Sequence, residues 1–236
     1  MKRIGSGLAL GFLVALLVGC GSGGSSDDGV DVCSAGTFAP SYVSKVEVLR
    51  WRTLPVSISF ANDPTLQGRS LRTVALAGME AWRTATGGVL AYNVIEESAA
   101  TVLAGESVAN ITVTFNVLPA RPTSGGELGH TTLKFTGHRL KQAEIRIDVW
   151  QNITAEEIDK ELLASTTHEF GHALGINGHS DEKRDVMSFE EDASQQAGLT
   201  ERDINTMKTA YCTEFGVSRA ACVPDTSRAV GTVTLR

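Results

Sequence analysis

Residues His168–His179 read HEFGHALGINGH and hold three of the five histidines of the chain. His168 and His172 are four positions apart, so on a helix their imidazoles lie one above the other and can reach one cation about 2 Å away. Glu169 follows the first of them and would point toward the open side of such a metal. A zinc ion lowers the pKa of a water there to roughly 7, and a neighbouring carboxylate can take its proton. The stretch therefore predicts a zinc site on a helix, with Glu169 as catalytic base.

The residues after this helix supply a third ligand. Gly175 stands where the helix is expected to end, and it lets the chain turn back. His179 follows as a third nitrogen donor, and Met187 lies in a loop beyond it. A bare His-Glu-x-x-His pattern occurs in unrelated helices, but the added Gly, His and Met argue against histidines that are merely solvated.

This arrangement resembles the metzincin clan and, within it, the matrixin-like bacterial metallopeptidases. The resemblance implies a zinc endopeptidase with one catalytic Zn²⁺ held by His168, His172 and His179, with Glu169 as the base. It also implies that Met187 lies in a tight turn beneath the metal, the Met-turn. The match is specific over 167–187 and weaker but consistent over 45–211.

Two departures from the family pattern stand out. The third His comes four residues after Gly175 instead of three, with Gly178 as the apparent insertion. A glycine can absorb an extra residue through unusual backbone angles, so His179 is preferred, with Asp181 as the alternative ligand. Phe189 stands two residues past the Met, where astacin-like and serralysin-like members have a Tyr, which argues against those branches.

A thermolysin-like plan would instead take its third ligand from a second helix. Glu190 and Glu191 lie at a plausible distance along the chain. That plan has no use for Gly175, His179 or Met187, so it is disfavoured.

The surrounding sequence predicts one domain of mixed α and β structure. Short runs rich in Val, Ile, Leu and aromatic residues predict strands, at 45–51, 55–60, 89–95, 110–117, 131–135 and 143–150. Apolar residues at helical spacing predict a helix that opens at Asp63 or Thr65 and ends at 87–88. A second helix starts at a Thr154–Glu157 capping box and ends at Gly175, and a third covers 200–211.

The fold class is therefore α+β. The resemblance implies a zincin-like domain: a twisted, mostly parallel mixed sheet packed on long helices, including the active-site helix, with a Met-turn and a C-terminal helix. We assign residues 32–215 to this catalytic domain and 216–236 to a C-terminal tail.

The N-terminus reads as a lipoprotein leader. Residues 1–19 combine a basic start with an apolar run at 8–18 that is too short to span a bilayer. The run ends in Leu-Val-Gly-Cys, which resembles the lipobox of bacterial lipoproteins and implies lipidation of Cys20. Residues 20–31 form a flexible Gly/Ser-rich tether. We expect an extracytoplasmic envelope protein, at the outer membrane or cell surface; an ordinary signal peptide with an incidental Cys is the alternative.

Composition limits the partners. The chain of 236 residues has a formal charge of -6, and loss of Lys2 and Arg3 with the leader leaves 19 basic against 27 acidic residues, or -8. Nucleic acid and anionic membrane surfaces need a concentrated basic footprint, and the sequence has no dense run of Lys and Arg. The expected partner is a protein or peptide substrate, with membrane contact only through the lipid and a monomeric state.

Three further cysteines, Cys33, Cys212 and Cys222, predict one disulfide and one odd thiol in an oxidising compartment. A Cys212–Cys222 bridge would staple a C-terminal loop, whereas a bridge from Cys33 would join the two chain ends, and spacing does not choose between them. Cys33 invites comparison with the inhibitory Cys of matrixin propeptides. Its surroundings lack the Pro-Arg-Cys-Gly pattern, so a disulfide is favoured for it.

Several alternatives stay open at this point. His130 and His138 could hold a second zinc, although no Asp stands between them at ligand spacing. An acidic cluster after His179 could bind Ca²⁺, but no calcium-loop pattern supports this. A catalytically silent, zinc-stabilised surface binding lipoprotein is the rival function, and a hydrolase acting on cell-wall material would share the same site.

Overall fold

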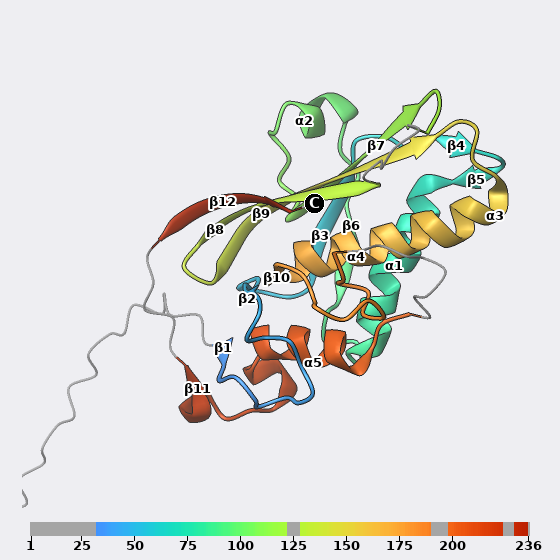
Figure 1. Ribbon diagram of the computed structural model, residues 1–236. Coiled ribbons are helices and arrows are strands. Elements are labelled where there is room, and N and C mark those ends of the chain that lie inside the picture. The colour runs from blue at the N-terminus through green and yellow to red at the C-terminus, as the bar shows by residue number, and fades with distance from the viewer. Residues whose placement is uncertain (1–31, 122–127, 190–197, 224–228, 236) are drawn as a thin grey trace, which may run out of the picture.

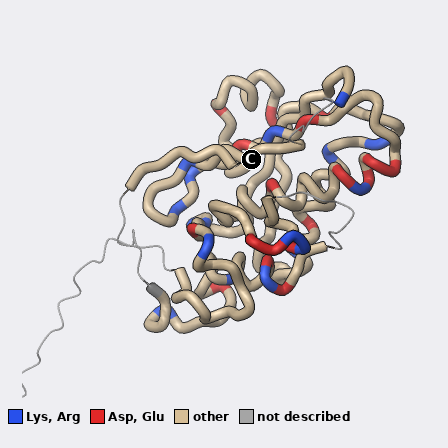
Figure 2. The backbone as a smooth tube through the Cα atoms, in the orientation of Figure 1, with Lys and Arg blue, Asp and Glu red and all other residues tan. Residues whose placement is uncertain are grey.

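The computed structural model describes residues 32–121, 128–189, 198–223 and 229–235. The signal peptide, Cys20 and nearly all of the tether lie outside these ranges. Among the described helices, none has the length and apolar character needed to cross a bilayer. Lys and Arg are interspersed with Asp and Glu along the described chain (Figure 2).

A six-stranded twisted sheet forms one layer of the molecule, and the long helices α1 and α4 lie against one of its faces (Figure 1). Its strands run in the order β12-β8-β9-β7-β3-β6. Their bounds are Val230–Leu235 (β12), Gly129–Thr136 (β8), Arg139–Trp150 (β9), Ile111–Leu118 (β7), Val56–Phe60 (β3) and Tyr92–Val94 (β6). The β9-β7, β7-β3 and β3-β6 pairs are parallel, and the two pairs made by β8 are antiparallel. The prediction of a mostly parallel mixed sheet is confirmed.

Helix α1 spans Leu71–Ala85 and starts later than the sequence predicted. Its N-cap is Ser70, whose hydroxyl accepts from the Thr73 N–H, so Asp63 and Thr65 are not caps. Thr65 instead belongs to a small hairpin, in which β4 (Thr65–Leu66) pairs with β5 (Arg69–Ser70). The Asp63 carboxylate supports the helix start from outside by accepting from the Ser70 hydroxyl, 2.9 Å away. A turn therefore separates the predicted cap from the helix.

The helix that carries the histidines begins as predicted. Thr154 and Glu157 form the capping box at the start of α3, Ala155–Glu157. The chain continues through a π-helical stretch, Ile158–Leu162, into α4, Leu163–Leu174. The sequence predicted one uninterrupted helix here, and the π-helical stretch is the difference.

Shorter elements complete the chain. The strand predicted over 45–51 is only two residues long: β2 (Glu47–Val48) pairs with β10 (Ile176–Asn177) just after α4. The predicted last helix is α5, Glu201–Ala210, and α2, Ala99–Leu103, was not predicted. Two 3-10 turns, Thr213–Phe215 and Arg219–Ala221, follow α5.

The segment from residue 216 is not simply a tail. After β11 (Cys222–Val223), which pairs with β1 (Val32–Cys33), the chain returns to the main sheet as β12. This strand was not predicted from the sequence, because a short run of Val, Gly and Thr carries a weaker β signal than the buried strands do.

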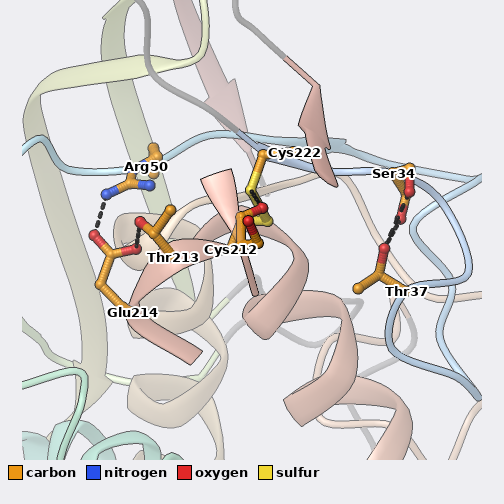
Figure 3. Close-up of a disulfide and its surroundings, with 8 residues drawn as sticks. Ser34, Thr37, Arg50, Cys212, Thr213, Glu214 and Cys222 are labelled. Atoms are coloured by element: carbon orange, nitrogen blue, oxygen red, sulfur yellow. Dashed lines mark hydrogen bonds and ion pairs between the residues drawn. A yellow bond between two sulfur atoms is a disulfide. The ribbon is translucent and has the colours of Figure 1, made fainter. Parts of the chain in front are cut away.

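The disulfide joins Cys212 to Cys222 and fastens β11 to the end of α5 (Figure 3). Cys33 is a free, buried thiol packed against this disulfide, so the bridge favoured for it was wrong. Nearby, Arg50 forms an ion pair with Glu214, which also accepts from the Thr213 hydroxyl (Figure 3). These contacts fix the end of α5.

Candidate metal centre

Three histidine rings converge at one point below the sheet. His168 and His172 come from adjacent turns of α4, with their Nε2 atoms 3.0 Å apart. His179 comes from the loop after β10, and its ring centroid lies 5.3 Å from that of His168 and 4.9 Å from that of His172. One ligand nitrogen from each ring lies within 4.8 Å of the other two. The structure thus brings together the three predicted ligands.

Backbone carbonyls orient the two helical rings. Nδ1 of His168 is 2.7 Å from the Val186 carbonyl oxygen, and Nδ1 of His172 is 2.7 Å from that of Ile176. A carbonyl oxygen only accepts, so each Nδ1 carries the hydrogen and donates it. The Nε2 lone pairs then face the common centre, as in other metal sites whose ligands are held by backbone carbonyls.

The ring of His179 also has a nitrogen available for a metal. Nε2 of His179 is buried and has no hydrogen-bond partner among the described residues. A buried polar atom without a partner costs free energy, and coordination of a cation would satisfy it. Three imidazole nitrogens with an open fourth position are the donor set of a catalytic zinc, so the residues present fit this metal.

The electrostatics of the cluster favour its metal-binding form. Burial lowers the pKa of His172 well below its ordinary value, and the neighbouring imidazoles of His168 and His179 add to this effect. Burial, together with His168, lowers the pKa of His179 to about 4. Neutral imidazole is the form that binds metal, so these two rings are ready to coordinate at neutral pH.

The side chain of Glu169 extends from α4 toward β8 and is fully buried. The Thr131 hydroxyl donates to its Oε2, and a Cβ at Gly129 would lie 2.8 Å from its Oε1. The glycine therefore leaves room for the carboxylate, and the threonine orients it. Sequence reasoning missed both residues, because they lie on a strand far from the motif and carry no pattern of their own.

Met187 packs under the histidine-bearing helix. It is fully buried, and a Cβ at Gly171 would come within 2.2 Å of its Sδ. Gly171, inside the His-Glu-x-x-His stretch, thus provides the space that Met187 fills. Met187 thus packs against α4 at Gly171, between the two helical histidines, and its role as the Met-turn stays a prediction.

The turn around Met187 is held by Asp203, which the sequence analysis also missed. The Asp203 carboxylate accepts from the backbone N–H of Val186 at 2.9 Å and of Met187 at 3.3 Å. It also accepts from the Tyr42 hydroxyl at 2.9 Å. Since the Val186 carbonyl orients His168, Asp203 helps to position that ligand through the turn.

Two glycines allow the loop to bring His179 back. Gly175 has φ 138°, and a Cβ there would lie 2.0 Å from the Leu49 carbonyl oxygen. Gly178 has φ 126°, so it too adopts a conformation that L side chains rarely take. The extra residue between Gly175 and His179 is accommodated by this backbone.

A family model described as matrixin matches residues 50–212, more than half of the chain. The chain belongs to the matrixin family. A comparison with curated proteins finds no match. The match runs from Arg50 to Cys212 and includes the three histidines, Glu169 and Met187. As a family, matrixins are zinc metallopeptidases, which agrees with the three-histidine cluster.

Two side chains anchor the C-terminal end of the histidine-bearing helix α4 in this matrixin. The Trp51 indole donates to the Ala173 carbonyl at 2.9 Å, and the Tyr211 hydroxyl donates to the Leu174 carbonyl at 2.6 Å. The last carbonyls of a helix have no partner within it, so these bonds satisfy groups that would otherwise be buried unpaired.

The remaining candidates of the sequence analysis do not join this matrixin centre. Asp181 is exposed, pairs with Arg202 at 2.8 Å and does not belong to the three-histidine group. Phe189 is exposed and lies edge-on to His179, with ring centroids 5.4 Å apart. His130 and His138 belong to no metal-binding group within the described ranges. The alternative ligands Glu190 and Glu191 lie outside those ranges.

Proposed function

We propose that this matrixin is a zinc-dependent endopeptidase. The observation that carries the proposal is the convergence of three imidazole nitrogens within 4.8 Å of one another, next to the buried carboxylate that follows the first of them. A purely structural zinc site normally has four protein ligands and has no need of such a carboxylate. This argues against the silent binding lipoprotein as the alternative.

The chemistry divides between the metal and the chain. Zinc, when bound, supplies Lewis acidity toward the scissile carbonyl and toward water. His168, His172 and His179 would hold it, each through a ring nitrogen. Glu169 accepts the proton of the attacking water and passes it to the leaving amine. Thr131 keeps the Glu169 carboxylate in place through its hydrogen bond.

Replacing Glu169 tests zinc binding and peptide hydrolysis separately. We expect Glu169→Gln to retain zinc and to lose nearly all hydrolysis of a quenched peptide, because the amide cannot accept the proton. Zinc content is measured by metal analysis on the same samples. A variant that contains zinc and cleaves at the wild-type rate would show that Glu169 is not the base.

Zinc dependence provides a second test. A chelator should abolish hydrolysis of the same peptide by the wild-type protein, and added Zn²⁺ should restore it. Hydrolysis that survives verified zinc removal would rule out the proposed mechanism.

We further propose that a lipid on Cys20 anchors the enzyme to the cell envelope. The Leu-Val-Gly-Cys sequence and the polar tether after it support this. In a bacterial host, wild-type protein should incorporate labelled palmitate and sediment with membranes, whereas Cys20→Ser should do neither. Cys33→Ser serves as the control, since that thiol is buried in the folded domain. Equal labelling of the Cys20→Ser variant would refute the anchor.

A further inference from the structure

Strand β8 is the strand of the sheet that touches the proposed base. Its residues Gly129 and Thr131 lie against Glu169, as described above. Along one edge β8 pairs with β9 over its whole length. A peptide that reaches Glu169 as a strand of this sheet therefore has only the other edge of β8 to pair with.

Most of that second edge, from Thr131 to Thr136, is already occupied by the chain itself. Strand β12 pairs antiparallel with β8, from Val230 opposite Thr136 to Leu235 opposite Thr131 (Figure 1). The pairing thus runs from the far end of β8 to the residue that donates to Glu169. Leu235 shares a sheet face with Thr131, because directly paired residues point to the same side.

The two faces of β12 differ. Gly231, Val233 and Leu235 are half-buried, and the last two pack against the hydrophobic core. Val230, Thr232 and Thr234 are exposed. Leu235 is thus an apolar side chain on the face of the sheet where Glu169 lies. Strand β12 has the backbone path and the side-chain alternation of an extended peptide bound along β8.

Peptides commonly bind proteins by adding a strand to a sheet edge, with backbone hydrogen bonds for affinity and alternate side chains for specificity. We propose that β12 is an internal competitor of the substrate: it occupies the edge of β8 from Thr131 to Thr136, and it must leave for an extended peptide to pair along that stretch as it approaches Glu169. The competition with substrate rests on the proposed endopeptidase function. The matched matrixin region ends at residue 212, so β12 lies outside it.

A substitution at Gly231 should release the strand. A Cβ there would lie 2.3 Å from Cζ of Phe135 on β8, so Gly231→Val crowds the Phe135 ring across the strand pair and weakens the pairing of β12 with β8. Thr232→Val is the matched control, because residue 232 is exposed and keeps the pairing. If β12 covers the edge in about nine of ten molecules, Gly231→Val raises kcat/KM for a long, extended peptide about tenfold. No rise in a zinc-loaded, folded variant would overturn the proposal.

A binding measurement separates this inference from the peptidase assignment. A fluorescent peptide with the sequence of residues 229–235, AVGTVTL, should bind the Glu169→Gln/Gly231→Val protein and not the Glu169→Gln/Thr232→Val protein, as measured by anisotropy. Binding without any hydrolysis in proteins that retain Glu169 would refute the endopeptidase and leave the strand occupancy standing. Failure of the peptide to bind the opened edge would refute the occupancy itself.

A covalent lock tests the same idea in the opposite direction, should Gly231→Val impair folding. The hydroxyls of Thr132 and Thr234 face each other across the two strands at 3.0 Å. With both residues changed to Cys and oxidised, β12 is held on β8, and turnover of the extended peptide should fall below that of the wild type. Reductant should restore it relative to wild type treated in the same way. Undiminished turnover in the locked protein would contradict competition by β12.

Discussion

At the scale of single residues, the metal centre depends on small side chains as much as on its ligands. Gly129 makes room for the Glu169 carboxylate, Gly171 for Met187, and Gly175 for the Leu49 carbonyl. At each of these positions, an added methyl group would collide with the side chain or carbonyl that lies against the glycine. The ligands alone would not make this site without these close approaches.

Gly171→Ala should therefore be costly despite its small size. The new Cβ would lie 2.2 Å from Sδ of Met187 and 2.9 Å from Trp82. Overpacking of this kind destabilises by about 1–3 kcal/mol, although alanine favours the helix. Chemical denaturation measures the loss. Gly171→Ala combined with Met187→Ala should cost less than the sum of the two single changes; simple additivity would mean that the glycine does not serve to seat the methionine.

Which site residues could be predicted from the sequence depends on how far apart along the chain the contacting residues are. The helical histidines and Glu169 are local, because a spacing of four residues fixes their common face. His179 was predicted from its place shortly after the helix-ending Gly175, although its four-residue spacing after that glycine departs from the family pattern. Thr131 and Asp203 were missed because they reach the site only through tertiary packing.

At the scale of elements, α4 is held at its C-terminal end and by the turn beneath it. Its last carbonyls accept from Trp51 and Tyr211, and the turn that orients His168 is tied to α5 by Asp203. Asp203 is also part of the capping box with Thr200 that starts α5. One carboxylate thus links the start of the last helix to the position of a metal ligand.

Removing the Asp203 carboxylate should lower both the stability of the protein and its affinity for zinc. Asp203→Ala leaves the N–H groups of Val186 and Met187 and the Tyr42 hydroxyl without their acceptor, a loss of about 2–4 kcal/mol. Outer partners of metal ligands typically contribute 10–100-fold in affinity, so zinc should bind about tenfold more weakly. Competition with a fluorescent chelator gives the affinity. The zinc affinity of Asp203→Asn, which keeps one acceptor oxygen, should lie between those of Asp203→Ala and the wild type. An unchanged affinity in both variants would show that Asp203 does not help to position the metal ligand.

Secondary structure was predicted best where the periodicity was long. Strands β7 and β9 and the helix beginning at Thr154 were found, because buried alternation and a capping box are strong local signals. The start of α1 was placed too early, since a hairpin intervenes after Asp63. Strand β12 was missed because only its pairing with β8 makes it a strand.

At the scale of the whole molecule, the buried histidines couple folding to pH. In the folded protein the pKa of His179 is about 4, against an ordinary value of 6.5, and that of His172 is also lowered. As pH falls, the unfolded chain therefore binds protons at these positions before the folded one does. The free energy of unfolding of zinc-free protein should be insensitive to these groups above about pH 6.5 and should decrease toward pH 4.

Denaturant titrations of the zinc-free protein across this pH range measure the effect. His179→Gln removes one of the responsible groups. The free energy of unfolding of the variant should therefore depend less steeply on pH than that of the wild type, and the difference separates the contribution of His179 from that of carboxylates that titrate in the same pH range. Equal slopes for the two proteins would mean that His179 is not held neutral by the fold.

The disulfide also limits how far β12 can travel. Cys222 is fastened to Cys212 at the end of α5, and only residues 223–229 separate it from the first residue of β12. A fully extended chain spans at most about 3.6 Å per residue, so the detached strand stays within roughly 30 Å of its anchorage. Its effective concentration near β8 is then on the order of millimolar. With so short a connection, a polypeptide that is scarce or pairs weakly with β8 would lose the competition to β12. Cleavage of the chain between Cys222 and β12 would remove this advantage, because the released strand would then be dilute.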